Sequence, residues 1–240
     1  FKKKNKTPII MYKQEFPYSS SSSSSSSSNE FNILDTIKIC NIVVTCDVGV
    51  EKLSILPLIS ENNLMFYNPE KFHTLKNRFP GSTSRLFESG NVVCTGNKSF
   101  ADVFITCYSI SYILRRMGYY AVTDCIRIRN IILGVTAPNQ IDIVKLYNFI
   151  SSAGQNVAYN PAKFSGCIFK SENPKYTITT FASGEMNITG CLDVELMMSM
   201  IQFFYKTYIE PCIFDINTHN DSSMSSGYNM FSENTVKKLI

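Results

Sequence analysis

A ten-residue segment that occurs twice constrains this chain more than any other feature. Residues 87–96 read FESGNVVCTG and residues 181–190 read FASGEMNITG, so both match F-x-S-G-x-x-x-x-T-G. Each copy predicts a strand ending in Phe, a tight Ser-Gly turn and a second strand ending in Thr-Gly, because glycine supplies the positive φ that short hairpin turns need. A second motif, Y-N-P-x-K-F, is doubled in the same order at residues 67–72 and 159–164. The chain is therefore a tandem repeat.

The two repeats keep the same order of landmarks at nearly the same spacing. Asn41 corresponds to Asn130, and Thr95 corresponds to Thr189. Between the landmarks, apolar residues alternate as in strands or recur at helical spacing, which predicts β-α-β-β-β-(β)-α for each unit. Edge strands of two such units can pair, which predicts an α+β fold with one curved antiparallel sheet, helices on one face and an open second face. Helices are expected at 53–60, 99–118, 141–151 and 194–209.

Composition sets the expected limits of the domains. Residues 1–30 hold a lysine cluster and ten consecutive serines, which have nothing apolar to bury and predict a disordered tail. The first repeat is then expected at 31–120 and the second at 121–210. Residues 211–240 are polar and rich in Asn and Ser, which predicts a second mobile tail.

Several functional classes find no support in the sequence. The eight cysteines include no C-x-x-C pair and only two histidines accompany them, so neither a zinc site nor a secreted disulfide scaffold is expected, and the thiols should be reduced. Apolar runs are too short to span a membrane. Without a Ser/His/Asp set or a phosphate loop, we expect neither an enzyme nor a cofactor nor a small-molecule substrate. The net charge of +4 does not by itself indicate a nucleic-acid-binding protein.

The open face of the sheet can be assigned because strand side chains alternate between faces. Ile42 and Val44 should pack beneath the helices, and Asn41 and Val43 should then point to the open side. The same rule places these residues on the open face: Thr45, Arg85, Phe87, Val93, Thr95, Asn130, Ile132, Thr177, Thr179, Phe181, Asn187 and Thr189. Aromatic wedges at both ends, with Asn, Thr and small apolar residues between them, suit the minor groove of A·T-rich DNA.

This order of motifs, given twice across residues 31–209, resembles the TATA-box-binding protein family. The resemblance implies a saddle-shaped sheet with helices on its convex face. Phe72 and Phe87 would insert at one end of the DNA site, and Phe164 and Phe181 at the other. Asn41 and Asn130 would lie at the centre. The remaining DNA-binding residues that we expect are the floor residues Val43, Ile132, Thr95 and Thr189, and Arg85 beside a wedge.

The resemblance also implies a function and partners. The chain would bind and bend double-stranded promoter DNA through its A·T-rich minor groove and act in transcription initiation in the nucleus. General transcription factors would be recruited through the convex helices and through two stirrup loops, at 80–83 and 172–174.

Some positions depart from the family pattern. Arg85 replaces a leucine, Asn187 replaces a floor valine, and Asn91 and Glu185 each replace a lysine. Fewer phosphate contacts predict weaker binding that depends less on salt. At Arg85 we expect a contact that favours binding, because the negative potential of a narrow minor groove attracts arginine. The alternative function is a saddle-shaped protein-interaction scaffold that has lost strong or sequence-specific DNA binding.

Overall fold

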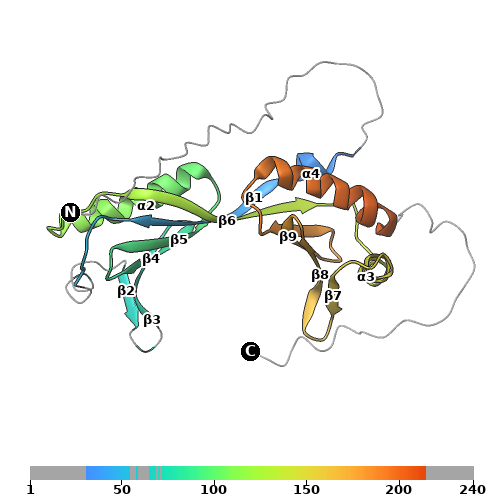
Figure 1. The fold of residues 1–240 in the computed structure, drawn as a ribbon, viewed down its shortest axis with the longest axis horizontal. Coiled ribbons are helices and arrows are strands. Elements are labelled where there is room, and N and C mark those ends of the chain that lie inside the picture. Colours follow the sequence, from blue (N-terminus) through green and yellow to red (C-terminus); the bar gives the residue numbers. More distant parts are fainter. Residues whose placement is uncertain (1–30, 55–57, 59–64, 69, 71, 215–240) are drawn as a thin grey trace, which may run out of the picture.

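The fold is built on one ten-stranded antiparallel sheet. The computed structural model describes residues 31–54, 58, 65–68, 70 and 72–214, without the side chains of residues 65, 72 and 73. The strand order is β2-β3-β4-β5-β1-β6-β10-β9-β8-β7 (Figure 1). The strands are β1 (Lys38–Asp47), β2 (Met65–Asn68), β3 (Phe72–Phe79), β4 (Ser82–Phe87), β5 (Asn91–Asn97), β6 (Asp124–Thr136), β7 (Val157–Asn160), β8 (Phe164–Glu172), β9 (Lys175–Thr180) and β10 (Glu185–Thr189).

The sheet arches like a saddle, as the repeat pattern predicted. Figure 1 shows β1 and β6 at the middle of the arch, with the outer strands hanging down at its two ends. The helices α2 (Phe100–Arg116) and α4 (Val194–Phe204) lie over the convex side, and α3 (Ile143–Ser152) lies beside β7 and β8 (Figure 1). The second repeat runs β6-α3-β7-β8-β9-β10-α4, which is the predicted order with its optional strand present. The two repeats meet edge to edge along the β1–β6 ladder.

Local sequence signals set the ends of the helices. Ser99 caps α2 by accepting a hydrogen bond from the Asp102 backbone N–H. Gly118 ends it at φ +84°, with the N–H groups of Gly118 and Tyr119 donating to the carbonyls of Arg115 and Leu114. Two short 3-10 turns (Ile33–Thr36 and Glu210–Cys212) and a π turn that continues α4 (Tyr205–Ile209) complete the helical elements. Most of the helix expected at 53–60 lies outside the described residues.

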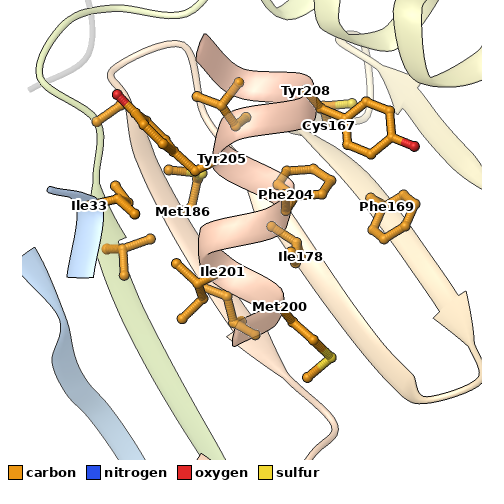
Figure 2. Packing of buried hydrophobic residues seen from close by; sticks show 14 of the residues in the cluster. Ile33, Cys167, Phe169, Ile178, Met186, Met200, Ile201, Phe204, Tyr205 and Tyr208 are labelled. Carbon is orange, nitrogen blue, oxygen red and sulfur yellow. The ribbon is translucent and has the colours of Figure 1, made fainter. Parts of the chain in front are cut away.

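Each lobe has its own hydrophobic core between the sheet and the helices. In the second lobe, Phe204 and Ile201 of α4 point toward Ile178 and Met186 of the sheet (Figure 2). Met197 and Met200 of α4 are buried as well, so both belong to this core. The chain past residue 210 also packs here, because Cys212 is buried and Ile213 pairs with Ile141. The described part of the second lobe therefore extends to residue 214, beyond the expected limit at 210.

The helical pattern was wrong at two outward positions. Helical spacing in the sequence groups Phe104 of α2 and Leu196 of α4 with the buried side, but they are 46% and 38% exposed. Both satisfy a three- or four-residue spacing to core residues, yet they lie at the border of the buried stripe. In α2 the side chains that face the core are Val103, Thr106, Cys107, Ile110, Ser111 and Leu114.

The core of the first lobe contains three neighbouring thiols beneath α2. The Sγ atoms of Cys94 and Cys107 are 3.8 Å apart, and Cys46 is buried beside them. Hydrogen bonds among the three thiols shift the pKa of each in opposite directions. Together with burial away from water and repulsion between the thiols, they raise the pKa of all three from 9.0 to about 12. The folded thiols therefore stay protonated well above the pH at which they ionise in the unfolded chain.

We expect these thiols to resist modification in the native protein. A thiol whose pKa is raised by folding adds stability below its unfolded value, and that stability is lost as the pH rises from about 9 toward 12. With a disulfide reagent at mildly alkaline pH, only the half-buried Cys40, Cys125 and Cys191 should react, and all eight should react in denaturant. Rapid native labelling of Cys107, located by peptide mapping, would contradict the closed core.

Candidate nucleic-acid interface

The middle of the open face brings together four residues that the sequence assigned to it. Asn41 is paired with Ile132 across the β1–β6 junction, and Val43 is paired with Asn130. All four are half-buried, whereas their neighbours Ile42, Val44, Ile131 and Leu133 are buried beneath the helices. The two pairs exchange under the pseudo-twofold axis, because Asn41 corresponds to Asn130 and Val43 to Ile132. Two amides and two small apolar groups thus form the centre of the floor.

Each central asparagine is held by a threonine of the duplicated hairpin. Asn130 Oδ1 accepts a hydrogen bond of 2.9 Å from Thr189 Oγ1. Asn41 makes the equivalent contact with Thr95, whose Oγ1 lies 3.4 Å from Asn41 Oδ1. The same Oδ1 also accepts the Gly96 backbone N–H at 2.7 Å. These bonds occupy the amide oxygens on the protein side. The amide N–H groups are therefore the donors that can serve base acceptors, although Asn41 Nδ2 also lies 3.3 Å from Thr95 Oγ1.

The Ser-Gly turn of each hairpin is clamped to the end of the central strand. The Gly90 N–H donates to the Phe87 carbonyl, and the Gly90 carbonyl accepts from the Val48 N–H. The second repeat copies both bonds, from Gly184 to Phe181 and from Ala137 to Gly184. Both glycines have positive φ, +79° and +92°. A Cβ on Gly90 would lie 2.3 Å from the Val50 carbonyl oxygen, so the close approach requires glycine.

The two phenylalanines of the second lobe form an aromatic pair on the open side. The rings of Phe164 and Phe181 lie edge to face, with centroids 5.7 Å apart and an interplanar angle of 72°. Phe164 is 45% exposed, so its ring is not packed in the core. The missing side chain of Gly166 makes room, because a Cβ there would come within 2.6 Å of the Phe164 ring. An aromatic pair with one exposed and one half-buried ring, at the end of a curved sheet, has the form of a wedge.

The first lobe shows one member of the equivalent pair. Phe87 is half-buried on the open face, and the neighbouring Leu86 is buried. The backbone of Phe72 is paired with Asn68 at the start of β3. The side chain of Phe72 lies outside the described residues, so its role as a wedge stays a prediction.

The pairing of the strands places on the open face two basic residues, Lys76 and Arg127, that the sequence analysis did not identify. Lys76, Arg85, Val93, Thr45 and Arg127 follow one another across β3, β4, β5, β1 and β6, each opposite the next. Directly opposed residues share a face, so the three basic side chains lie on the open face of the first lobe. Alternation alone could have found Lys76. Finding Arg127 required the β1–β6 register.

A fourth basic residue joins this group at an irregularity in the central ladder. Val43 is opposite Asn130 and Val44 is opposite Ile128, so Arg129 is an extra residue without a partner strand position. Its Nε donates a 2.8 Å hydrogen bond to Thr45 Oγ1, which holds the guanidinium over the open face. The basic row is defined here as Lys76, Arg85, Arg127 and Arg129.

The corresponding row of the second lobe is nearly neutral. Across β8, β9, β10, β6 and β1 it reads Ile168, Thr179, Asn187, Gly134 and Lys38. Only Lys38 carries charge, and Asn187 adds the amide that the sequence singled out. The two ends of the open face thus differ chemically although their backbones are related by pseudo-symmetry.

The two stirrup turns are shorter than expected. β3 and β4 are joined by Pro80–Gly81, and β8 and β9 by Asn173–Pro174. Thr83 and Glu172, which were assigned to these loops, are strand residues paired with Arg78 and Lys175. Within the described residues, no group of three or more His, Cys, Asp or Glu could hold a metal ion, and no helix is long and apolar enough to cross a membrane.

Comparison with known proteins places the chain in a family. The family model for transcription factor TFIID, or TATA-binding protein (TBP), matches residues 36–117 and 125–208. The chain belongs to this family. The two matched segments correspond to the two repeats, and the family consists of DNA-binding transcription factors, which are not enzymes.

Relatives from distant organisms and a solved structure agree with this assignment. TATA-box-binding protein 2 of Entamoeba histolytica is 29% identical over 160 residues, covering 66% of this chain and 74% of the relative. The TATA-box-binding protein of Archaeoglobus fulgidus is 29% identical over 157 residues, covering 64% of this chain and 84% of the relative. The structure of Methanococcus jannaschii TBP superimposes with a TM-score of 0.62 at 26% identity, covering 72% of this chain and 97% of that one. The TBP fold is therefore retained at low identity.

Proposed function

We propose that this protein is a transcription initiation factor that binds TATA-like promoter DNA through the minor groove and bends it. The observation that carries the proposal is the paired arrangement at the centre of the open face, where Asn41 and Asn130 present amides beside Val43 and Ile132. Amide donors suit the acceptors of A·T pairs, and small apolar neighbours leave no room for a guanine amino group. The relatives named TATA-box-binding protein support TATA-like DNA as the ligand.

Bending is assigned to the aromatic residues at the ends of the face. Phe164 and Phe181 would enter a base step at one end, and Phe72 and Phe87 at the other. Apolar wedges of this kind unstack base steps and kink the duplex away from the protein. The contact between the exposed ring of Phe164 and the half-buried ring of Phe181 supports this role, because it places both rings together on the open face.

The basic row supplies phosphate contacts in this proposal. Each Lys or Arg that neutralises a phosphate releases a counterion, so its removal lowers the salt dependence of binding by about one unit of slope. Arg85 lies between Lys76 and Val93 in the row and beside the wedge Phe87. General transcription factors would contact the two stirrup turns and the convex helices, and the site of action would be the nucleus.

The test is DNA binding measured by fluorescence anisotropy at matched salt. The protein should bind a TATA-containing duplex at least ~10-fold more tightly than a G·C duplex, which corresponds to about 1.4 kcal/mol. Replacing Asn41 and Asn130 with leucine should reduce this preference, whereas Asn148→Leu on α3 should not change it. Equal affinity for both duplexes would contradict TATA recognition. No measurable affinity for either would favour the protein-interaction scaffold.

A further inference from the structure

The convex helix α2 carries an outward stripe that DNA binding does not use and that the proposed function leaves open to protein partners. Ile105, Tyr108 and Tyr112 are 65%, 53% and 56% exposed, and Phe104 is 46% exposed. Ala101, Ile105, Tyr108 and Tyr112 are separated by four, three and four residues, which is the spacing of a helix-pairing seam. The outer stripe is defined here as Phe104, Ile105, Tyr108 and Tyr112. It lies opposite the buried residues of α2 and faces away from the sheet.

Two aromatic side chains of the outer stripe pack against each other. The rings of Phe104 and Tyr108 are stacked, with centroids 6.4 Å apart and an interplanar angle of 21°. The side chains between the caps of α2 include one acid, Asp102 in its first turn, and two bases, Arg115 and Arg116 in its last turn. All three are exposed. An apolar seam with opposite charges at its two ends complements itself when a second copy runs in the opposite direction.

We propose that two copies of this chain associate back to back through antiparallel α2 helices. Tyr108 is the middle residue of the 17-residue helix, so the twofold axis passes beside it. Asp102 of each copy then lies near Arg115 and Arg116 of the other, and the contact occurs twice, as an isologous interface requires. Because α2 is on the convex side, both open faces stay free. The dimer therefore presents two DNA-binding saddles that face away from each other.

The expected affinity is modest. One pair of helices buries less than the ~1,200–2,000 Å² typical of stable complexes, so the dimer should dissociate at a concentration on the order of 1–100 μM. Aromatic side chains are favoured at such interfaces because they bury a large area with few rotatable bonds. The association does not depend on DNA, so it can be tested without any assumption about the ligand of the open face.

Sedimentation velocity over about 1–100 μM tests the association directly. The parent chain should shift from monomer to dimer over this range, and Tyr108→Glu should remain a monomer, because it places two carboxylates beside the axis. Phe203→Glu is the matched control, since Phe203 is 61% exposed on the other convex helix. It should dimerise like the parent. Circular dichroism of each variant at low concentration verifies that the fold is kept.

A charge exchange tests the antiparallel direction. Asp102→Arg alone and the double change Arg115→Glu with Arg116→Glu each put like charges at both ends of the seam in a homodimer, so each variant should dimerise ~10-fold or more weakly than the parent. In an equimolar mixture, the dimer that contains one copy of each variant has only opposite-charge contacts at the two ends, so the mixture should recover the dimer. A parent chain that stays monomeric at every concentration overturns the proposal, whether another segment or another protein then covers the stripe. So does a dimer that survives Tyr108→Glu, or a mixture that fails to recover.

Discussion

Replacing both Phe164 and Phe181 with alanine is expected to remove the DNA bend at one end of the site and to weaken binding to TATA-containing DNA by ~30-fold or more. The rings lie edge to face at the surface of the second lobe, so a wedge loses both of its members at once. Removing two aromatic side chains that contact bases costs about 2 kcal/mol or more, which is ~30-fold in affinity. Energy transfer between dyes at the two ends of the duplex reports the bend.

The controls separate a wedge from a packing role. Phe203→Ala removes an exposed phenylalanine from the convex side and should leave both bend and affinity unchanged. Phe169→Ala removes a buried one and should lower thermal stability, because large-to-small core changes cost about 3–5 kcal/mol. The Phe164 and Phe181 double variant should melt close to the parent. If its bend equals that of the parent, the two rings are not wedges.

Gly90→Ala is expected to cost at least ~3 kcal/mol of folding free energy, although it adds one methyl group. The new Cβ would lie 2.3 Å from the Val50 carbonyl oxygen, and the residue has a φ of +79°. Relief of the clash requires a backbone shift in the turn, which breaks the hydrogen bonds from Gly90 to Phe87 and from Val48 to Gly90. Urea unfolding followed by circular dichroism measures the loss.

Gly81→Ala is the matched control for backbone strain. Gly81 has a similar φ of +75°, but nothing lies within 4 Å of a Cβ placed there. The cost should be about 1–2 kcal/mol, from the left-handed conformation alone. The difference between the two variants therefore measures the close approach that positions Phe87. Equal losses of stability would mean that the turn relaxes freely and that the clamp contributes little.

Much of the fold could be predicted from the sequence because local periodicity and duplication agreed. Alternation along 41–47 placed Ile42 and Val44 under the helices, and the same rule assigned Phe87 and Phe181 to the open face. The repeat gave the number of lobes and their symmetry. The caps Ser99 and Gly118 gave the limits of α2, since both act through bonds within a few residues of the chain.

Features that depend on contacts between distant segments could not be predicted in this way. The threonine that holds each asparagine is 54 or 59 residues away in the chain, and no local pattern indicates the bond. The basic row could be identified only from the register of five strands. That register includes a bulge at Arg129, which changes the face to which neighbouring side chains of β6 point. The exposure of Phe104 could not be predicted, because helical spacing does not distinguish the middle of a buried stripe from its border.

Because the two lobes carry unequal charge, the two orientations of the protein on a DNA duplex are not equivalent. A perfectly twofold protein would bind a duplex equally well in either of two orientations, and could not tell upstream from downstream. Here the first lobe carries Lys76, Arg85, Arg127 and Arg129, while the equivalent positions of the second lobe carry Ile168, Thr179, Lys38 and Cys40. In the proposed DNA complex, a site whose two halves differ in groove width would therefore be bound in one preferred orientation, set by side chains on a backbone whose two halves are related by pseudo-symmetry.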